Sequence, residues 1–324
     1  MKLNPKLFQS DVEQEPIRAG FGRGLLKAGQ LDERVVGFCA DLTESTKMED
    51  FKKAFPNRFI EVGVAEQNLV TVAAGMAAAG KIPFTSSYAT FSPGRNWEQI
   101  RTTICYNNVN VKIVGSHAGV SVGPDGGSHQ ALEDIAMMRA LPRMTVISPC
   151  DSIEAEKATL AVAKFVGPTY IRLAREKTPI ITTAETPFTL GKANVLRARV
   201  TSHVAIIATG SLVYNALMAA EELSKEGIEA TVINLHTIKP IDRETIISAA
   251  KHAGRIVTVE EHQKAGGMGS AVAELLVELY PVPMRIVGVD DKFGQSGKPT
   301  ELIEFYGLGV HSIKQAVRSL VDKK

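Results

Sequence analysis

Short apolar runs rich in β-branched residues alternate with longer helical patterns along this chain, and this alternation constrains the fold more than any other feature. The runs lack the regular polar positions of a half-exposed strand, so both faces of each strand should be buried. Strands of this kind, separated by helices, form a parallel sheet with helices on both sides. The candidate strands of the first half are VVGF (35–38), FIEVG (59–63), FTSS (84–87), VKIVG (111–115), TVIS (145–148) and YIRL (170–173).

Helical patterns separate these strands, and one break divides the chain. Residues 176–193 hold two prolines and five threonines without a clear period, as is typical of a linker. Strands and helices alternate again after it. We therefore expect two three-layer α/β domains: a parallel-sheet domain at 1–178, a linker at 179–198, and a smaller, mostly parallel domain at 199–324. The helical patterns of the first domain lie near residues 14–28, 65–79, 95–106, 130–140 and 151–165.

Composition excludes several classes of function. The 324 residues are 44% hydrophobic and 22% charged, with a net charge of +2. This balance is ordinary for a globular protein with a sizeable core and gives no sign of a nucleic-acid or membrane partner. The three cysteines form no C-x-x-C pair and lie in or beside apolar runs, which favours reduced, buried thiols. The N-terminus lacks an apolar signal region, so we expect a cytoplasmic protein.

Glu66 is the first candidate for chemistry. It follows the apolar run FIEVG and opens a helix rich in Ala and Gly, LVTVAAGMAAAG. A carboxyl group there should be buried, and an unpaired buried carboxylate is costly. It could hydrogen-bond a ring nitrogen of a flat ligand, or it could simply be an acid stabilised by the helix dipole.

Two further segments carry polar or aromatic side chains at expected strand ends. Phe91 and Trp97 flank a Pro-Gly turn, where they could stack on a heterocycle or fill the core. The loop GSHAGVSVGPDGGSHQ (115–130) holds five glycines together with His117, Asp125 and His129. Loops that follow parallel strands bind ligands in α/β proteins, so we favour a site over a simple turn. The histidine spacing is weak support for a metal site, and we expect none.

Two arginines end another expected strand, in the run YIRLARE. Arg172 and Arg175 lie at the strand's carboxyl end, where a guanidinium could bind phosphate through two parallel hydrogen bonds. A solvated surface arginine is the alternative for each.

In combination, these segments resemble the C-terminal half of transketolase. Four strings carry the resemblance, in the order and spacing of that family: CADLTEST (39–46), GVAEQN (63–68), ATFSPGRNWEQIR (89–101) and the loop at 115–130. The resemblance covers nearly the whole chain. It implies a pyrimidine-binding thiamine diphosphate domain followed by a transketolase C-terminal domain. It also implies transfer of a two-carbon ketol unit from a ketose phosphate to an aldose phosphate.

The resemblance also implies roles for individual residues. Glu66 looks like the acid that bonds the aminopyrimidine ring of the cofactor, and Phe91 like the aromatic that stacks on it. Asp41 looks like a residue lining the cofactor side, and Asp125 with His129 like the pair that binds the sugar's hydroxyl and carbonyl oxygens. The group that holds the acceptor's phosphate is matched by Arg18, Ser45, His117 and Arg175. The family commonly has a second aromatic at the position of Gly94, and Trp97 could fill that space.

The diphosphate-binding domain of the family, with its G-D-G motif and metal ligands, has no match in these residues. The chain therefore resembles one subunit of a split transketolase. We expect an N-terminal subunit to supply diphosphate binding and Mg²⁺ (or Ca²⁺), in an assembly with two copies of each chain. Two alternatives remain: the beta subunit of a 2-oxo-acid dehydrogenase decarboxylating component, and a non-catalytic regulatory subunit with the same fold.

Overall fold

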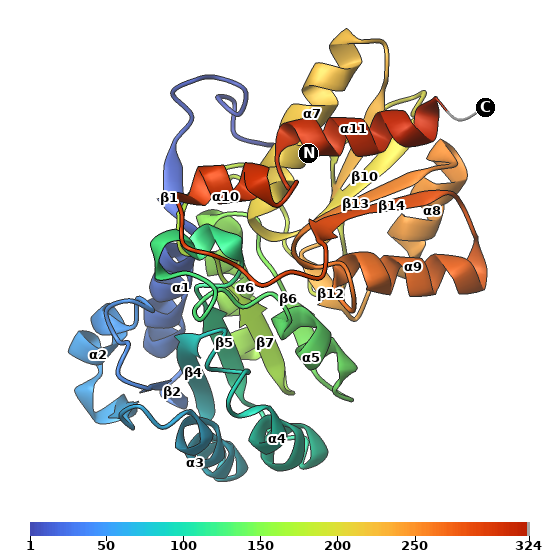
Figure 1. The fold of residues 1–324 in the computed structure, drawn as a ribbon. Helices are drawn as coiled ribbons and strands as arrows, with labels where there is room; N and C mark the ends of the chain where they lie inside the picture. Colours follow the sequence, from blue (N-terminus) through green and yellow to red (C-terminus); the bar gives the residue numbers. More distant parts are fainter. Residues whose placement is uncertain (323–324) are drawn as a thin grey trace.

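A seven-stranded sheet forms the centre of the first domain in the computed structural model, which describes residues 1–322 (Figure 1). Its strands run parallel except for β12, which pairs antiparallel with β6. The carboxyl ends of the parallel strands therefore lie along one edge. In spatial order the strands are β12 (Thr237–Lys239), β6 (Thr145–Ile147), β7 (Thr169–Arg172), β5 (Lys112–Ser116), β4 (Ile82–Tyr88), β2 (Val35–Cys39) and β3 (Phe59–Glu61).

Helices cover both faces of this sheet because successive strand residues point to opposite sides. In β2, for example, Val35 and Cys39 belong to the apolar cluster on the α1 side, whereas Val36 and Phe38 belong to the cluster on the α3 side. The first-domain helices are α1 (Ile17–Leu31), α2 (Glu49–Ala54), α3 (Glu66–Ala78), α4 (Trp97–Gln99), α5 (Asp134–Ala140) and α6 (Ser152–Lys164). Three shorter segments are a π-helix at Ile100–Tyr106 and 3₁₀ turns at Pro56–Arg58 and Val120–Asp125.

The second domain repeats this plan around a five-stranded sheet, which is parallel except for β9. Its strands, in spatial order, are β14 (Met284–Val289), β13 (Ile256–Gln263), β10 (Val204–Ala208), β11 (Ala230–Asn234) and β9 (Asn194–Arg197). Its helices are α7 (Val213–Lys225), α8 (Arg243–Ala253), α9 (Met268–Leu279), α10 (Pro299–Phe305) and α11 (Val310–Val321), with a 3₁₀ turn at Gly210–Leu212. The expected fold class, two mostly parallel α/β domains, is thus confirmed.

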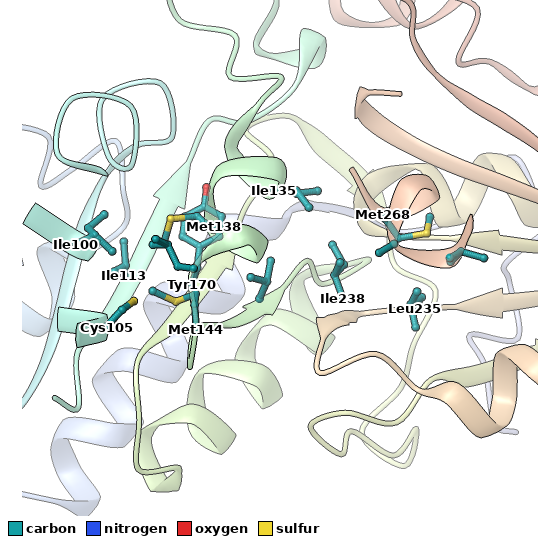
Figure 2. Packing of buried hydrophobic residues seen from close by; sticks show 14 of the residues in the cluster. Ile100, Cys105, Ile113, Ile135, Met138, Met144, Tyr170, Leu235, Ile238 and Met268 are labelled. Carbon is teal, nitrogen blue, oxygen red and sulfur yellow. The ribbon is translucent and has the colours of Figure 1, made fainter. Parts of the chain in front are cut away.

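One continuous hydrophobic core joins the two domains. Figure 2 shows this cluster running from Ile100 and Ile113, through Met138 of α5, to Leu235 and Met268 of the second domain. Strand β12 strengthens the connection, because it belongs to the later part of the chain but pairs with the first sheet. The domains therefore share buried apolar surface, which is the main source of stability.

Several expected elements differ in detail. The run FIEVG is not a buried strand: β3 covers only Phe59–Glu61, lies at the sheet edge, and leaves Glu61 exposed. The first helix begins at Ile17, because residues 14–16 form β1 (Gln14–Pro16). This strand pairs with β8 (Lys177–Pro179), which lies in the segment expected to be irregular. The helix expected over 95–106 starts at Trp97 and continues as a π-helix.

The described residues contain no helix that is both long enough and apolar enough to cross a membrane. The thiols of Cys39, Cys105 and Cys150 are buried and form no disulfide with one another.

A buried ion pair lies where the domains meet. The Nε of Arg172 donates to Asp134 Oδ2 at 2.9 Å, and its Nη2 donates to the carbonyl of Glu261 at 2.7 Å. The hydroxyl of Tyr170 also donates to Asp134, at 2.8 Å. Arg172 is only 6% exposed, so both interpretations drawn from the sequence, phosphate ligand and solvated arginine, are wrong for this residue.

Replacing Asp134 with alanine should destabilise the chain strongly, because the charge of Arg172 would stay buried without its partner. Loss of one partner from a buried pair costs about 3–5 kcal/mol. Urea unfolding followed by circular dichroism would measure the change. The matched control is Glu226→Ala, which removes the partner of Arg318 from an exposed ion pair and should shift the urea midpoint far less. Equal shifts for the two variants would contradict the structural role of Arg172.

Candidate active site

The carboxyl-end edge of the seven-stranded sheet gathers most of the residues singled out from the sequence. Asp41 follows β2, Phe91 follows β4, His117 follows β5, and Arg175 follows β7. Because these strands are parallel neighbours, their following loops meet at one edge. Asp41 and His117 both adopt left-handed backbone, with φ of 59° and 56°. This conformation is uncommon for residues other than glycine and is frequent at functional sites.

Glu66 is the first residue of α3 and is 4% exposed. The Nη1 of Arg95 donates to both carboxylate oxygens, at 3.2 and 3.3 Å, and so balances the negative charge. Asn96 holds the start of the helix, because its Nδ2 donates to the backbone carbonyl of Glu66 at 2.7 Å. A hollow of about 710 Å³ opens beside the carboxylate, lined by residues 64–68 and Arg95.

Phe91 contacts Arg95, which lines this hollow, and is part of an aromatic group. The Arg95 guanidinium lies over its ring at 4.2 Å from the centroid, so Arg95 contacts both Phe91 and Glu66. The ring of Tyr88 stacks on Phe91 at 5.9 Å and on His117 at 3.8 Å. His129 meets the edge of Phe91 at 5.3 Å. One stacked group thus connects Phe91 to the histidines of the glycine-rich loop (residues 115–130).

Two arginines bring positive charge to the same region. Arg18 Nη1 donates to the carbonyl of Ser45 at 2.6 Å and lies 3.2 Å from His117 Nε2. Arg175 Nη1 donates to the carbonyl of Val122 at 2.6 Å and lies 3.4 Å from Asp125 Oδ1. Burial, and then the nearby charge of Arg175, lower the pKa of Arg18. The four residues expected to bind phosphate therefore lie close together, although they come from four segments.

His117 is held as a neutral imidazole by its surroundings. Burial, followed by the charges of Arg18, Arg175 and His129, lowers its pKa to about 3. Since Arg18 is always protonated and donates to Nε2, that nitrogen is the acceptor. The ring proton then lies on Nδ1, which is 2.9 Å from the hydroxyl oxygen of Ser116.

Trp97 and Asp41 are not part of this group of contacts. The indole of Trp97 packs against the shared core and donates from Nε1 to the carbonyl of Met137, at 2.9 Å. Asp41 is exposed, and its backbone N–H donates to Glu61 Oε1 at 2.7 Å. Gly94 belongs to a tight turn, because a Cβ there would lie 1.9 Å from the carbonyl oxygen of Thr90. A larger residue at position 94 would require a different backbone.

Arg95 and Tyr88 are candidate functional residues that were not predicted from the sequence. Arg95 lies within one of the strings that carry the family resemblance, but its partner Glu66 is 29 residues away. Tyr88 is the last residue of β4, and a position at the carboxyl end of a parallel strand could have identified it. Within residues 1–322, no group of three or more His, Cys, Asp or Glu side chains could hold a metal ion.

Comparison with known proteins gives two matching family models. Residues 14–180 match the pyrimidine-binding domain of transketolase, and residues 191–313 match the transketolase C-terminal domain. The 6-deoxy-6-sulfo-D-fructose transketolase subunit of Clostridium sp. (strain MSTE9) is 42% identical, covering 98% of each chain. A putative transketolase C-terminal section from Methanocaldococcus jannaschii is 44% identical over 95% of this chain and 97% of that protein.

Among solved structures, a split-gene transketolase described as an inactive β4 tetramer superposes with a TM-score of 0.88. It is 44% identical, and the match covers 95% of this chain and 98% of that one. The matches to split subunits extend over nearly their whole length. This chain belongs to the transketolase family, as a C-terminal subunit that carries the pyrimidine-binding and C-terminal domains.

Proposed function

We propose that this chain is the C-terminal subunit of a two-chain transketolase that moves a two-carbon ketol unit between sugar phosphates. The observation that carries the proposal is the shared sheet edge. A buried carboxyl group, Glu66, opens onto a hollow there, and the cationic pair Arg18 and Arg175 lies in the neighbouring loops. A flat cofactor and an anionic sugar could be bound side by side at this edge.

The residues at this edge fit the pyrimidine end of thiamine diphosphate. Glu66 presents a carboxyl group whose recorded side-chain partner, Arg95, is half exposed and can move aside. Arg95 also covers the ring of Phe91, and displacement of its side chain would free an aromatic face, which suits a flat heterocycle. When bound, the cofactor supplies the electron sink that the cleavage of a carbon–carbon bond requires. Glu66 then holds a proton at the ring nitrogen, while Phe91 positions the ring.

Two groups of residues would bind the sugar substrate. Asp125 and His129 would bind its hydroxyl and carbonyl oxygens. The anionic group at its end would be bound by Arg18, Ser45, His117 and Arg175. The two arginines supply the positive charge, because His117 is neutral. His117 acts through Arg18, which donates to its Nε2, and its stacking on Tyr88 fixes the position of the ring. Guanidinium groups bind phosphate through charge-assisted hydrogen bonds, and a sulfonate presents the same kind of charged oxygen acceptors. The name of the similar Clostridium protein specifies a sulfo-sugar, which supports a sulfonate as the alternative anion.

A partner chain completes the proposal. An N-terminal subunit would bind the diphosphate and its Mg²⁺ or Ca²⁺, in a two-plus-two assembly. The similar solved structure described as an inactive β4 tetramer supports two points: such chains self-associate, and they lack activity alone. A cytoplasmic site of action fits the sugar-phosphate substrates. The cationic cluster favours this function over the beta subunit of a 2-oxo-acid dehydrogenase component, whose substrates carry no phosphate.

Reconstitution tests the proposal. We expect the chain mixed with an N-terminal subunit that carries the G-D-G motif to transfer ketol units from xylulose 5-phosphate to ribose 5-phosphate, with thiamine diphosphate and Mg²⁺. Either chain alone should be inactive. A coupled spectrophotometric assay measures turnover, and 6-deoxy-6-sulfo-D-fructose is included as a second donor. A well-formed, cofactor-loaded pair without activity on any sugar would contradict the proposal, and decarboxylation of pyruvate would favour the alternative enzyme.

Glu66→Gln should remove most of the turnover of the reconstituted pair without preventing folding. Glutamine keeps the shape of glutamate but cannot hold the proton, and a positioned acid typically contributes about 10²–10⁴-fold to rate. Steady-state turnover and the melting temperature are measured together. The control is Glu98→Gln, an exposed carboxyl group on α4, which should keep full rate. Unchanged turnover in Glu66→Gln would remove Glu66 from the mechanism.

His117 should remain a neutral imidazole with its proton on Nδ1 between about pH 5 and pH 8, since its pKa is lowered to about 3. Long-range ¹H–¹⁵N correlation spectra of the ring nitrogens would show this directly, with the His117→Asn variant used for assignment. A ring that takes up a proton between pH 7 and pH 5 would show that the surroundings of His117 differ from those described.

A further inference from the structure

The second domain contacts the glycine-rich loop at two separate places, although the loop belongs to the first domain. The first contact is the carboxylate of Glu261, in β13. Its Oε1 accepts from the backbone N–H of Ser121 at 2.5 Å, and its Oε2 accepts from the hydroxyl of Ser211 at 2.9 Å. The fit is close, because a Cβ at Gly119 would lie 2.3 Å from this carboxyl group.

The second contact is made by the 293–299 segment, which leads from β14 to α10. In Figure 1 the chain between these two elements runs from the second domain toward the first. Gln130, 3% exposed, closes the loop against this segment. Its Nε2 donates to the carbonyls of Val120 at 3.0 Å and Gln295 at 3.0 Å. One side-chain amide therefore ties the start of the 3₁₀ turn to the second domain.

Glycines make this contact possible on both sides. A Cβ at Gly294 would lie 1.7 Å from Gln130 Oε1, and a Cβ at Gly127 would lie 2.6 Å from the carbonyl oxygen of Gly294. The segment is itself anchored, since the hydroxyl of Tyr306 donates to the carbonyl of Phe293 at 2.9 Å. The backbone of the 293–299 segment thus lies directly against the backbone of the loop at Gly127, and position 294 has no room for a side chain.

The loop needs this support because it has little structure of its own. Its five glycines lose more conformational freedom on ordering than other residues do. Yet it carries Asp125 and His129, which must be held against Arg175 and Phe91. Arg175 reaches the loop at Val122 and Asp125, whereas the second domain reaches it at Ser121 and Gln130.

We propose that the second domain is a positioning part of the active site: Gln130, Gly294 and Glu261 set the place of Asp125 and His129 and thereby the affinity for the sugar substrate. The inference deepens the proposed transketolase function and rests on it for the substrate. Gln130 belongs to the loop, and Glu261 and Gly294 touch the loop rather than the substrate, so all three act through Asp125 and His129.

Gly294→Ala and Gln130→Met test the proposal. The first forces the 293–299 segment away from Gln130, and the second keeps the side-chain volume but removes the donor. The control is Val317→Ala, which weakens the core of the second domain on α11, a helix that packs mainly against α7, β13 and β14. Hydrogen exchange of the full chain, followed by mass spectrometry of peptides covering residues 117–131, reports the loop without any need for activity.

We expect both test variants to speed exchange in the loop by about tenfold, the effect of losing one buried hydrogen bond. In the reconstituted pair they should raise KM for the sugar phosphates by a similar factor, while the Kd for thiamine diphosphate stays unchanged. Val317→Ala should lower the melting temperature and leave loop exchange and KM as they were. Unchanged loop exchange in both test variants, or faster exchange with unchanged KM, would overturn the proposal. A pair inactive on all sugars would instead refute the proposed function, with loop exchange still reporting on the contact.

Discussion

The buried guanidinium of Arg172 is the interaction on which the arrangement of this structure depends. It ends β7 and donates to Asp134, at the start of α5, and to the carbonyl of Glu261, in the second domain. A buried charge is tolerated only when its partners are all in place. The strand, the helix and the second sheet must therefore come together as one unit, and the continuous apolar core around Met138 and Met268 gives that unit its stability.

The geometry of the candidate active site depends on this contact between the two domains. The backbone carbonyl of Glu261 accepts from Arg172, and its carboxylate accepts from Ser121 of the glycine-rich loop. A single residue therefore links the ion pair to the site. The loop is thereby held by two domains, although its own sequence is rich in glycine. On the other side of the site, Arg95 balances the charge of Glu66 and covers the face of Phe91. Charge pairing thus explains how an acid is tolerated at a buried helix start.

Much of the fold could be predicted from local pattern, and the exceptions have a common cause. The strands of the central sheet and the start of α3 at Glu66 follow from apolar runs and helical periodicity. Strand β12 was missed because three residues carry no period, and its pairing with β6 depends on chain packing. The exposure of β3 was also missed, because an apolar run does not reveal whether its strand lies at an edge.

For the site, the sequence determined the chemical types and their order: an acid at a helix start, an aromatic after a strand, and a loop with two histidines and an aspartate. Those features are local, and they carried the family resemblance. Only the tertiary structure decided the partners. It paired Arg95 with Glu66, turned Trp97 toward Met137, buried Arg172 against Asp134, and set Gln130 against the backbone of the second domain. The physical reason is that such contacts join residues from separate segments of the chain. They exist only after both sheets have packed, and no periodicity along the sequence encodes them.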